Sequence, residues 1–206
     1  MCDNCRKKNI QLKVTQEWID KLTDFRETYF PVLEVETNTS NLVNGIAASY
    51  YGISNVGKAL HRCKYENGGD FPDWLLRLTL KAFYNYFGKE KFDIILYVPP
   101  TESGDLVKKF AEKISKSLDI PIYHTLKKNK ITEPQKIFQT NLLKTENLKN
   151  VFTVENAQEI AGKRILLIDD IFDSGATVKE IGKYLSKLGA VKIAPLVIAK
   201  TVSGDL

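Results

Sequence analysis

The sequence has 206 residues, of which 43% are hydrophobic, so the chain is long enough to bury one full core and a small appendage. Its 30 basic and 25 acidic residues give a net charge of +5, which suits anionic ligands but indicates nucleic-acid binding only weakly. No apolar run approaches the roughly 20 residues of a membrane span, and no signal peptide precedes the first charged residues, so we expect no membrane partner. Three cysteines are too few for a secreted disulfide scaffold, which predicts a reducing, cytoplasmic compartment.

The chain begins MCDNCRKK, in which Cys2 and Cys5 have the spacing of zinc ligands. A structural zinc site needs four ligands, so the pair taken alone is read as two free thiols. The run CDNC followed by basic residues resembles the closing pair of the zinc-binding module in RecQ-type DNA helicases, where two further cysteines lie upstream. That resemblance implies that Cys2 and Cys5 bind Zn²⁺ only together with upstream cysteines. It also implies that this chain is the C-terminal part of a longer DNA helicase.

An N-terminal extension is expected before the main domain. Thr15 to Phe30 spaces its apolar residues as an amphipathic helix does, with Thr15 as the cap and Pro31 as the stop. The polar, turn-prone stretch from Asn38 to Asn44 is then a joint. We therefore expect an extension over residues 1–40, consisting of a remnant zinc module plus a helix, and a second domain over residues 41–206.

The middle of the chain alternates helical and strand patterns. Asp73 to Phe87 predicts a helix, with Pro72 in its first turn and Gly88 placed to end it. The buried-strand run FDIILYV from Phe92 to Val98 follows, and we interpret it as the first strand of a sheet. After the loop PPTESGD, a further helix is predicted over Leu106 to Leu118.

A basic segment without apolar periodicity follows a short second strand predicted over Ile120 to Thr125. Leu126 to Gln139, LKKNKITEPQKIFQ, is a loop long enough to serve as a lid. Its lysines are candidates for closing over a pyrophosphate, although a solvated run of charge explains them equally well. The candidate lid residues are Lys127, Lys128, Lys130, Gln135 and Lys136.

The most informative stretch is RILLIDDIFDSGATVKE. Arg164 to Ile168 is an uninterrupted apolar run, and Gly175 to Leu188 has helical spacing, which predicts a buried parallel strand feeding its crossover helix. Between them lie Asp169 and Asp170 and then a loop, Asp173-Ser174-Gly175-Ala176-Thr177. A small-residue loop at a helix start presents backbone N–H groups to a phosphate. The two carboxylates suit sugar hydroxyls or a hard cation such as Mg²⁺. Together these features describe a site for a ribose 5-phosphate.

This stretch resembles the phosphoribosyl-pyrophosphate (PRPP) signature of type I phosphoribosyltransferases. An ordinary strand end in a doubly wound sheet, or a receiver domain, is an alternative, but neither needs the SGAT loop. A ComF-like resemblance extends over about Leu60 to Lys200, and Lys64-Tyr65 followed by Gly68-Gly69 resembles the ComF hood beside the active site. A surface turn with an exposed lysine remains an alternative for that pair. The resemblance implies a three-layer α/β fold with a mostly parallel twisted sheet.

The same resemblance assigns roles to residues. Asp169 and Asp170 would be the catalytic residues, holding the ribose hydroxyls and, indirectly, Mg²⁺. The loop from Asp173 to Thr177 would bind the 5-phosphate. The pyrophosphate loop would comprise Pro99, Pro100 and Thr101. ComF-type proteins carry arginines after the proline, whereas this chain continues with Thr101-Glu102-Ser103-Gly104-Asp105.

The expected function is transfer of the phosphoribosyl group of PRPP to an unknown acceptor with release of pyrophosphate. Whether the chain is an enzyme stays open, because two carboxylates replace the family arginines. The alternative is a non-catalytic PRPP-sensing, nucleotide-sensing or interaction module of a DNA helicase. A third hypothesis is DNA contact through the lysine-rich lid and the N-terminus. A homo-oligomer is left open.

Overall fold

The computed structural model describes residues 30–35, 38–39, 41–51, 55–66, 69–100, 104–129 and 151–201. All of these except Phe30 belong to one compact unit, Pro31–Val202. The helix predicted over Thr15 to Phe30 lies outside the described residues, apart from Phe30, and so do Cys2 and Cys5. No helix among the described residues has both the length and the apolar composition needed to cross a membrane.

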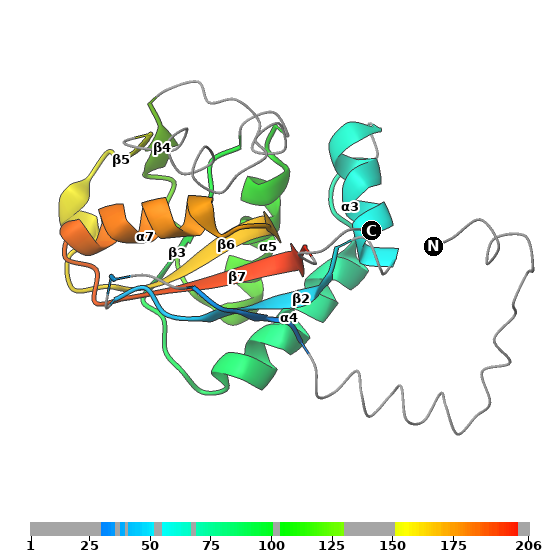
Figure 1. Ribbon diagram of the computed structural model, residues 1–206, viewed down its shortest axis with the longest axis horizontal. Coiled ribbons are helices and arrows are strands. Elements are labelled where there is room, and N and C mark those ends of the chain that lie inside the picture. The colour runs from blue at the N-terminus through cyan, green and yellow to red at the C-terminus, as the bar shows by residue number, and fades with distance from the viewer. Residues whose placement is uncertain are drawn as a thin grey trace, which may run out of the picture. The chain divides into compact units, whose positions relative to one another are not determined.

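The centre of this unit is a five-stranded sheet with the order β1-β2-β7-β6-β3 (Figure 1). Only the β1–β2 pair is antiparallel, and every other neighbouring pair is parallel. The mostly parallel α/β sheet predicted from the sequence is therefore confirmed. Its strands are β1 (Val32–Leu33), β2 (Gly45–Tyr50), β3 (Ile94–Tyr97), β6 (Arg164–Phe172) and β7 (Lys192–Lys200).

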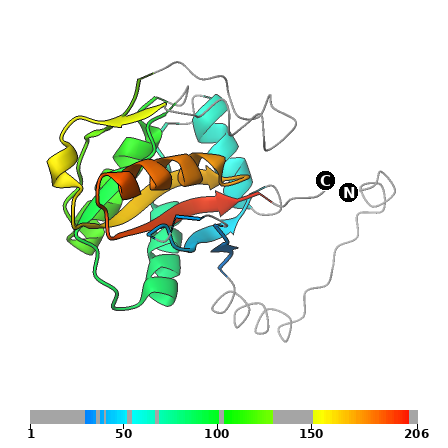
Figure 2. The ribbon, with the colours of Figure 1, turned by 60° about the vertical axis from the view of Figure 1, so that its left-hand side comes forward.

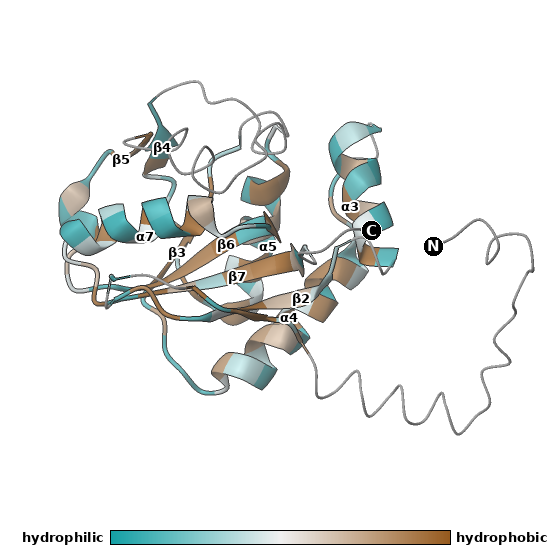
Figure 3. Ribbon diagram, in the orientation of Figure 1, coloured by the Kyte–Doolittle hydropathy of each residue, from teal (hydrophilic) through white to brown (hydrophobic). Residues whose placement is uncertain are grey.

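Helices cover both faces of the sheet and complete the three predicted layers. On one face, α4 (Asp73–Phe87) packs on β2 and β7, and α5 (Leu106–Leu118) packs on β3 and β6. On the other face, α7 (Ala176–Lys187) packs on β7, as Figures 1 and 2 show from two directions. Figure 3 shows the hydrophobic strands between the helices, and the outward surface of α7 is hydrophilic. Strands buried on both faces explain why their sequences are continuous apolar runs rather than alternating ones.

Two helices begin and end as the sequence predicted. Both α4 and α5 have the predicted bounds, because their apolar spacing is regular and their ends carry clear breakers. Gly88 ends α4 with a φ of +57°, and its N–H donates to the carbonyl of Tyr84. Asp119 ends α5 in the left-handed region, with a φ of +53°. Short polar residues tolerate this conformation better than β-branched or bulky residues do.

Three parts of the fold differ from the sequence prediction. The run FDIILYV is not the first strand, since β1 and β2 precede it and occupy the opposite edge of the sheet. The strand predicted over Ile120 to Thr125 is reduced to one bridge, between Ile122 and Ile95. The start of the predicted lid loop forms β4 (Leu126–Lys128), which pairs antiparallel with β5 (Phe152–Val154). A short 3₁₀ helix, η2 (Ala157–Glu159), leads from β5 back towards β6.

The segment before α4 also contains a helix that the sequence pattern did not predict. This helix, α3 (Asn55–Tyr65), packs on β2 and β7 and ends with the Lys64-Tyr65 pair. Its buried residues are Val56, Gly57, Leu60 and Cys63. Because α3 follows the carboxyl end of β2, it stands at the edge of the sheet where open α/β folds bind ligands.

Candidate functional site

Asp169 and Asp170, here called the acid pair, lie inside β6 rather than after it. The sequence predicted that the strand would end at Ile168, but its pairing with β7 continues to Phe172. Asp170 is buried, with 6% of its surface exposed, and Asp169 is half-buried. Because consecutive strand residues point to opposite faces, the two carboxylates meet different neighbours. The acid pair thus lies within a central strand that pairs with both β3 and β7.

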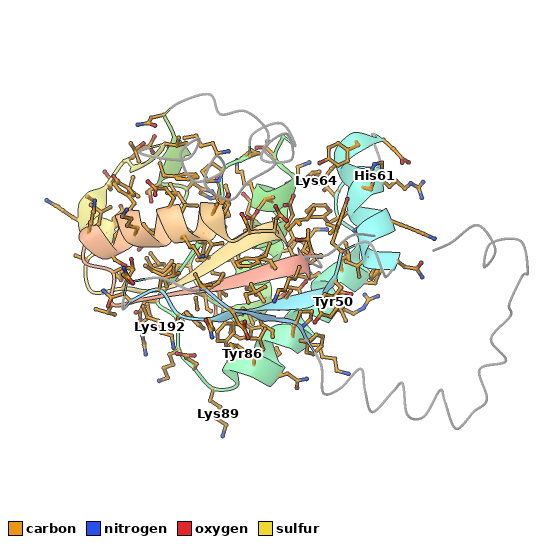
Figure 4. The ribbon with its side chains drawn as sticks, viewed as in Figure 1. Tyr50, His61, Lys64, Tyr86, Lys89 and Lys192 are labelled. Carbon is orange, nitrogen blue, oxygen red and sulfur yellow. The ribbon has the colours of Figure 1, made fainter. Side chains whose placement is uncertain are left out.

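Asp170 is joined to α3 by an ion pair. The Nζ of Lys64 lies 2.7 Å from Oδ2 of Asp170, and the two side chains are only 14% and 9% exposed. Figure 4 shows Lys64 on the side of α3 that faces the ends of the central strands. Burial alone lowers the pKa of Lys64, but the charge of Asp170 and the hydrogen bond to it outweigh burial and raise that pKa above its ordinary value. The alternative of an exposed lysine in a surface turn is therefore wrong.

Asp169 has a strongly perturbed carboxyl group. Burial, and after it the charge of Asp170, raises the pKa of Asp169 to about 8. The Asp170 N–H donates to Oδ1 of Asp169 over 2.8 Å, which acts in the opposite direction. Two adjacent carboxylates repel each other when both are ionised, which disfavours the charged form of Asp169. At neutral pH the raised pKa of Asp169 favours its protonated form.

Lys128 of β4 is near enough to Asp169 for the two charges to interact. Its side chain is half-buried, and its Nζ lies 6.0 Å from the centre of the Phe152 ring. Burial lowers the pKa of Lys128, while the charge of Asp169 acts in the opposite direction. The neighbouring Lys127 instead lies exposed, 3.9 Å from Glu155. Of these two predicted lid lysines, Lys128 is the one whose pKa responds to the charge of Asp169.

The loop after β6 leads directly into α7. Gly175 precedes the helix with a φ of +74° and, as a glycine, offers no capping side chain of its own. A Cβ on Gly175 would lie 2.7 Å from Cζ of Phe172, so only glycine fits here without displacement. The hydroxyl of Thr201 donates to Asp173 over 2.8 Å and fixes the far side of the loop. The first N–H groups of an α-helix have no intrahelical partner and carry the positive end of the helix dipole.

The loop after β3 ends at the same edge of the sheet. Pro99 is buried and Pro100 is half-buried immediately beyond the strand, whereas Thr101 lies outside the described residues. Behind them, the Tyr97 hydroxyl lies 3.2 Å from Nδ1 of His124. Because β3 and β6 are parallel neighbours, their carboxyl ends face the same crevice. The structure therefore brings the two prolines, the acid pair and the α7 loop to one edge.

An open cleft of about 420 Å³ lies along α3, and the sequence analysis did not anticipate it. Four of its lining residues, Lys58, His61, Arg62 and Glu66, are exposed. Burial and the neighbouring Tyr65 raise the pKa of Tyr51. In the sequence, the only signal of this cleft is that Lys58, Arg62 and Glu66 are four residues apart. That spacing places them on one side of a helix, but the sequence pattern did not predict a helix here. The lining residues are Tyr51, Gly57, Lys58, His61, Arg62 and Glu66.

Several predicted site residues cannot be placed. Thr101, Lys130, Gln135 and Lys136 lie outside the described residues, as do the candidate zinc ligands Cys2 and Cys5. The roles suggested for them stay predictions. In contrast, Ser174 is placed, with its Oγ accepting a hydrogen bond from the Ala176 N–H over 3.4 Å.

The acid pair fits Mg²⁺ only through intervening oxygens. Among the residues that the structure describes, no three histidine, cysteine, aspartate or glutamate side chains gather as a metal centre would require. Lys64 occupies Oδ2 of Asp170, which leaves few carboxylate oxygens for direct coordination. Mg²⁺ retains several waters in proteins and is usually bound by one or two carboxylates together with substrate phosphates. The donor set therefore suits an ion held through water and ligand oxygens.

Comparison with known proteins points to the same part of the chain. Residues 107–204, a little under half of the sequence, match the family model of the phosphoribosyl transferase domain. This segment includes α5, the acid pair, the α7 loop and β7. The match supports the resemblance to phosphoribosyltransferases inferred from the signature, whereas the CDNC run lies outside the matched segment.

Two curated relatives are similar over shorter stretches. Competence protein F of Haemophilus influenzae is 34% identical over 85 residues, which are 40% of this chain and 37% of that protein. Transcriptional regulator GfcR of Methanococcoides burtonii is 33% identical over 60 residues, or 29% of each chain. The chain thus spans about a third of the length of these relatives. The similarity to competence protein F supports the ComF-like resemblance.

Among solved structures, the chain is similar to a purine phosphoribosyltransferase from Pyrococcus horikoshii. The identity is 22%, the TM-score is 0.43, and the alignment covers 64% of this chain and 77% of that one.

Proposed function

We propose that this chain is a ComF-like type I phosphoribosyltransferase that binds PRPP with Mg²⁺ and transfers its phosphoribosyl group to an acceptor. One observation carries the proposal. The acid pair and the start of α7 stand at one edge of the sheet, separated only by the short loop after β6. Those two features have the chemistry and the spacing that the sugar and the phosphate of a ribose 5-phosphate require.

The 5-phosphate would bind at the start of α7. Backbone N–H groups of the first turn, with the hydroxyls of Ser174 and Thr177, would donate to its oxygens. The left-handed Gly175 lets the backbone turn there without a Cβ meeting Phe172. The hydrogen bond between Thr201 and Asp173 supports this role, since it ties the loop to the end of β7.

The ribose hydroxyls would bind at the acid pair. Asp170, whose charge is balanced by Lys64, would accept a hydrogen bond from one hydroxyl. Asp169 would bind the neighbouring hydroxyl, either accepting or donating according to its proton. Lys64 thereby acts as a positioning residue, because its ammonium group fixes the rotamer of Asp170.

The reaction would proceed at the anomeric carbon of the bound ribose. The bond from this carbon to the pyrophosphate oxygen breaks as the bond to the acceptor nucleophile forms, so positive charge grows on the ring and negative charge on the leaving group. Bound Mg²⁺ would neutralise part of the pyrophosphate charge. Lys128 of β4 interacts electrostatically with Asp169 and would supply a second positive charge in a partly water-excluded position.

A second function is favoured by the loop after β3. At the position of the family arginines, this chain carries Glu102 and Asp105, whose negative charges oppose a pyrophosphate. The chain would then bind PRPP or a nucleotide without turnover, as a sensing or interaction module. In that case the CDNC run suggests a RecQ-type DNA helicase, with its own zinc site, as the protein to which the module is attached.

A pyrophosphate-release assay separates the two functions. The full chain is incubated with PRPP, Mg²⁺ and a panel of heterocyclic bases, carboxylated and uncharged. Acceptor-dependent release that is lost in an Asp169→Asn/Asp170→Asn variant supports the transferase. PRPP binding without release by any acceptor rejects the transferase in favour of the module.

A further inference from the structure

Two side chains at the carboxyl end of β3 have no assigned role in the proposed transfer reaction. The hydroxyl of Tyr97, the last residue of β3, lies 3.2 Å from Nδ1 of His124, and 5.6 Å separates the centres of the two rings. Tyr97 is buried, and its pKa is raised by that burial and then by the charges of Glu112 and Asp105. Its phenol therefore keeps its proton at neutral pH and can donate the hydrogen bond to His124.

The segment that contains His124 runs along β3, the last strand in the order of the central sheet. Just before it, the Tyr123 N–H donates to the carbonyl of Ile95 over 3.0 Å. Just after it, the carbonyl of Thr125 accepts from the Glu155 N–H over 3.0 Å, which begins the separate two-stranded sheet of β4 and β5 (Figure 1). His124 therefore lies where the chain leaves the central sheet and becomes β4.

The hydrogen bond is close along the chain to Lys128. This lysine is the last residue of β4, four residues after His124. It is half-buried, and its charge interacts with that of Asp169. Because β4 belongs to a two-stranded sheet, the contact between His124 and Tyr97 adds to its attachment to the central sheet. The backbone of β4 is thus anchored within a few residues of Lys128.

The same hydrogen bond lies directly before the two prolines that begin the predicted pyrophosphate loop. Tyr97 is followed by Val98, whose N–H donates to the carbonyl of Ile168 over 2.9 Å, one residue before the acid pair. Pro99 and Pro100 come next. A displacement of Tyr97 would therefore move the two prolines relative to the acid pair.

On the basis of the transfer reaction proposed above, we propose that Tyr97 and His124 are positioning residues for the pyrophosphate of PRPP. Their hydrogen bond joins the two segments assigned to the pyrophosphate, namely the prolines after β3 and the strand that carries Lys128. Both segments are then held in place before the ligand arrives, so less ordering is needed on binding. Neither side chain contacts the reacting atoms, and each acts through Lys128 and the backbone after β3.

Two ligands that differ by the pyrophosphate test this role. PRPP with Mg²⁺ and ribose 5-phosphate with Mg²⁺ are each titrated calorimetrically into the full chain. Tyr97→Phe removes the hydroxyl alone, His124→Leu removes the ring nitrogens, and His124→Asn keeps a polar atom near the position of Nδ1. Tyr184→Phe is the matched control, because the Tyr184 hydroxyl accepts from the Val154 N–H of β5 over 3.3 Å and so ties the same strand pair to α7. Thermal unfolding checks that each variant is folded.

Tyr97→Phe and His124→Leu should each weaken binding of PRPP about 5-fold or more and leave the affinity for ribose 5-phosphate unchanged. The double variant should lose no more than the larger single change, since both changes remove one hydrogen bond. His124→Asn and Tyr184→Phe should retain the affinity for PRPP.

Unchanged PRPP affinity in both Tyr97→Phe and His124→Leu would overturn the assignment while leaving the proposed function intact. Equal losses for PRPP and ribose 5-phosphate, additive losses in the double variant, or the same loss in Tyr184→Phe would overturn it as well. Absence of PRPP binding by the wild type would instead reject the proposed function, and this inference with it.

Discussion

At the scale of single residues, the Lys64–Asp170 ion pair is the contact that joins α3 to the central strand β6. Both side chains are almost entirely removed from water, so neither charge is stable without the other. The ammonium group of Lys64 lies against Oδ2 of Asp170 and so holds that carboxylate in place. The Lys64–Asp170 ion pair therefore both positions a residue of the candidate site and stabilises the fold.

Replacing Lys64 by methionine should destabilise the protein by about 3 kcal/mol, because the charge of Asp170 is then buried and unpaired. In a double-mutant cycle measured by urea unfolding, Lys64→Met/Asp170→Asn should cost less than the sum of the two single changes. The exposed pair Lys109–Asp70, at 2.9 Å, is the matched control and should show little coupling. Additive effects at Lys64 and Asp170 would contradict the role assigned to their ion pair.

Asp169 should make stability depend on pH. Its pKa is raised from 3.8 to about 8 in the folded state, so between these values the folded protein binds more protons than the unfolded chain. The contribution of Asp169 is therefore fully present below pH 4 and is lost as the pH rises through about 8. Asp169→Asn should remove this part of the pH dependence and should be more stable than the wild type above pH 8.

The measurement is the free energy of unfolding of both proteins by urea across this pH range. Asp119→Asn, at the exposed end of α5, serves as the control. A wild type and an Asp169→Asn variant whose stabilities change in parallel from pH 4 to pH 9 would show that Asp169 is not perturbed.

The sequence predicted which residue types form the candidate site better than it predicted which residues contact one another. The two aspartates and the small-residue loop were predictable, because they lie within a few positions of one another in one strand–loop–helix unit. The role of Lys64 as the partner of Asp170 was not predictable from spacing, since a crossover fold brings together residues that are far apart in the chain. The hood resemblance indicated the neighbourhood of Lys64 but left the contact undetermined.

At the scale of elements, the turn from β6 into α7 has little tolerance for change. Gly175 and Gly162 share a φ of +74°, but a Cβ at Gly162 would meet nothing within 4 Å. Each substitution by alanine should cost about 1–2 kcal/mol for the left-handed backbone. Only at Gly175 does the added Cβ also meet the ring of Phe172, so only Gly175→Ala should displace the loop after β6 and weaken PRPP binding, by about 10-fold or more.

Calorimetry with PRPP and urea unfolding of both glycine variants separate the two effects. Equal loss of PRPP affinity in Gly162→Ala and Gly175→Ala would mean that general destabilisation, rather than loop geometry, controls binding.

Lys127 and Lys128 of β4 provide a second comparison within one element. Lys128 is half-buried and interacts electrostatically with Asp169, whereas its neighbour Lys127 is exposed. Lys128→Met should weaken binding of PRPP about 10-fold while changing the affinity for ribose 5-phosphate little, since the lost charge would act on the pyrophosphate. Lys127→Met should affect neither ligand. Equal effects of Lys128→Met on PRPP and on ribose 5-phosphate would argue against a pyrophosphate contact.

Helices and strands with a regular apolar pattern were predicted accurately, and those with an irregular or short pattern were not. Long helices with clear ends, such as α4 and α5, were predicted to the residue. The helix α3 was missed because its eleven residues include Gly57 and a mixed, mostly polar surface. The strands β4 and β5 were missed because each has only three residues and gains its stability from pairing with the other.

At the scale of the whole molecule, the order of the strands decides where the site lies. The strands β2, β7, β6 and β3 run parallel, so their carboxyl ends share one edge. The segments that follow β2, β3 and β6 place α3, the two prolines and the loop before α7 at that edge. The sequence predicted the sheet type, but the positions of β2 and α3 depend on long-range pairing that local patterns do not specify.

The central claim is that this edge binds PRPP through the acid pair. The most direct test is calorimetric titration of PRPP with Mg²⁺ into the wild type and the Asp169→Asn/Asp170→Asn variant. We predict saturable binding by the wild type and a loss of affinity of about 100-fold or more in the variant, while PRPP at 100 times its Kd should stabilise the wild type by about 2.7 kcal/mol. Equal binding by both proteins, or no binding by the wild type, would contradict the claim.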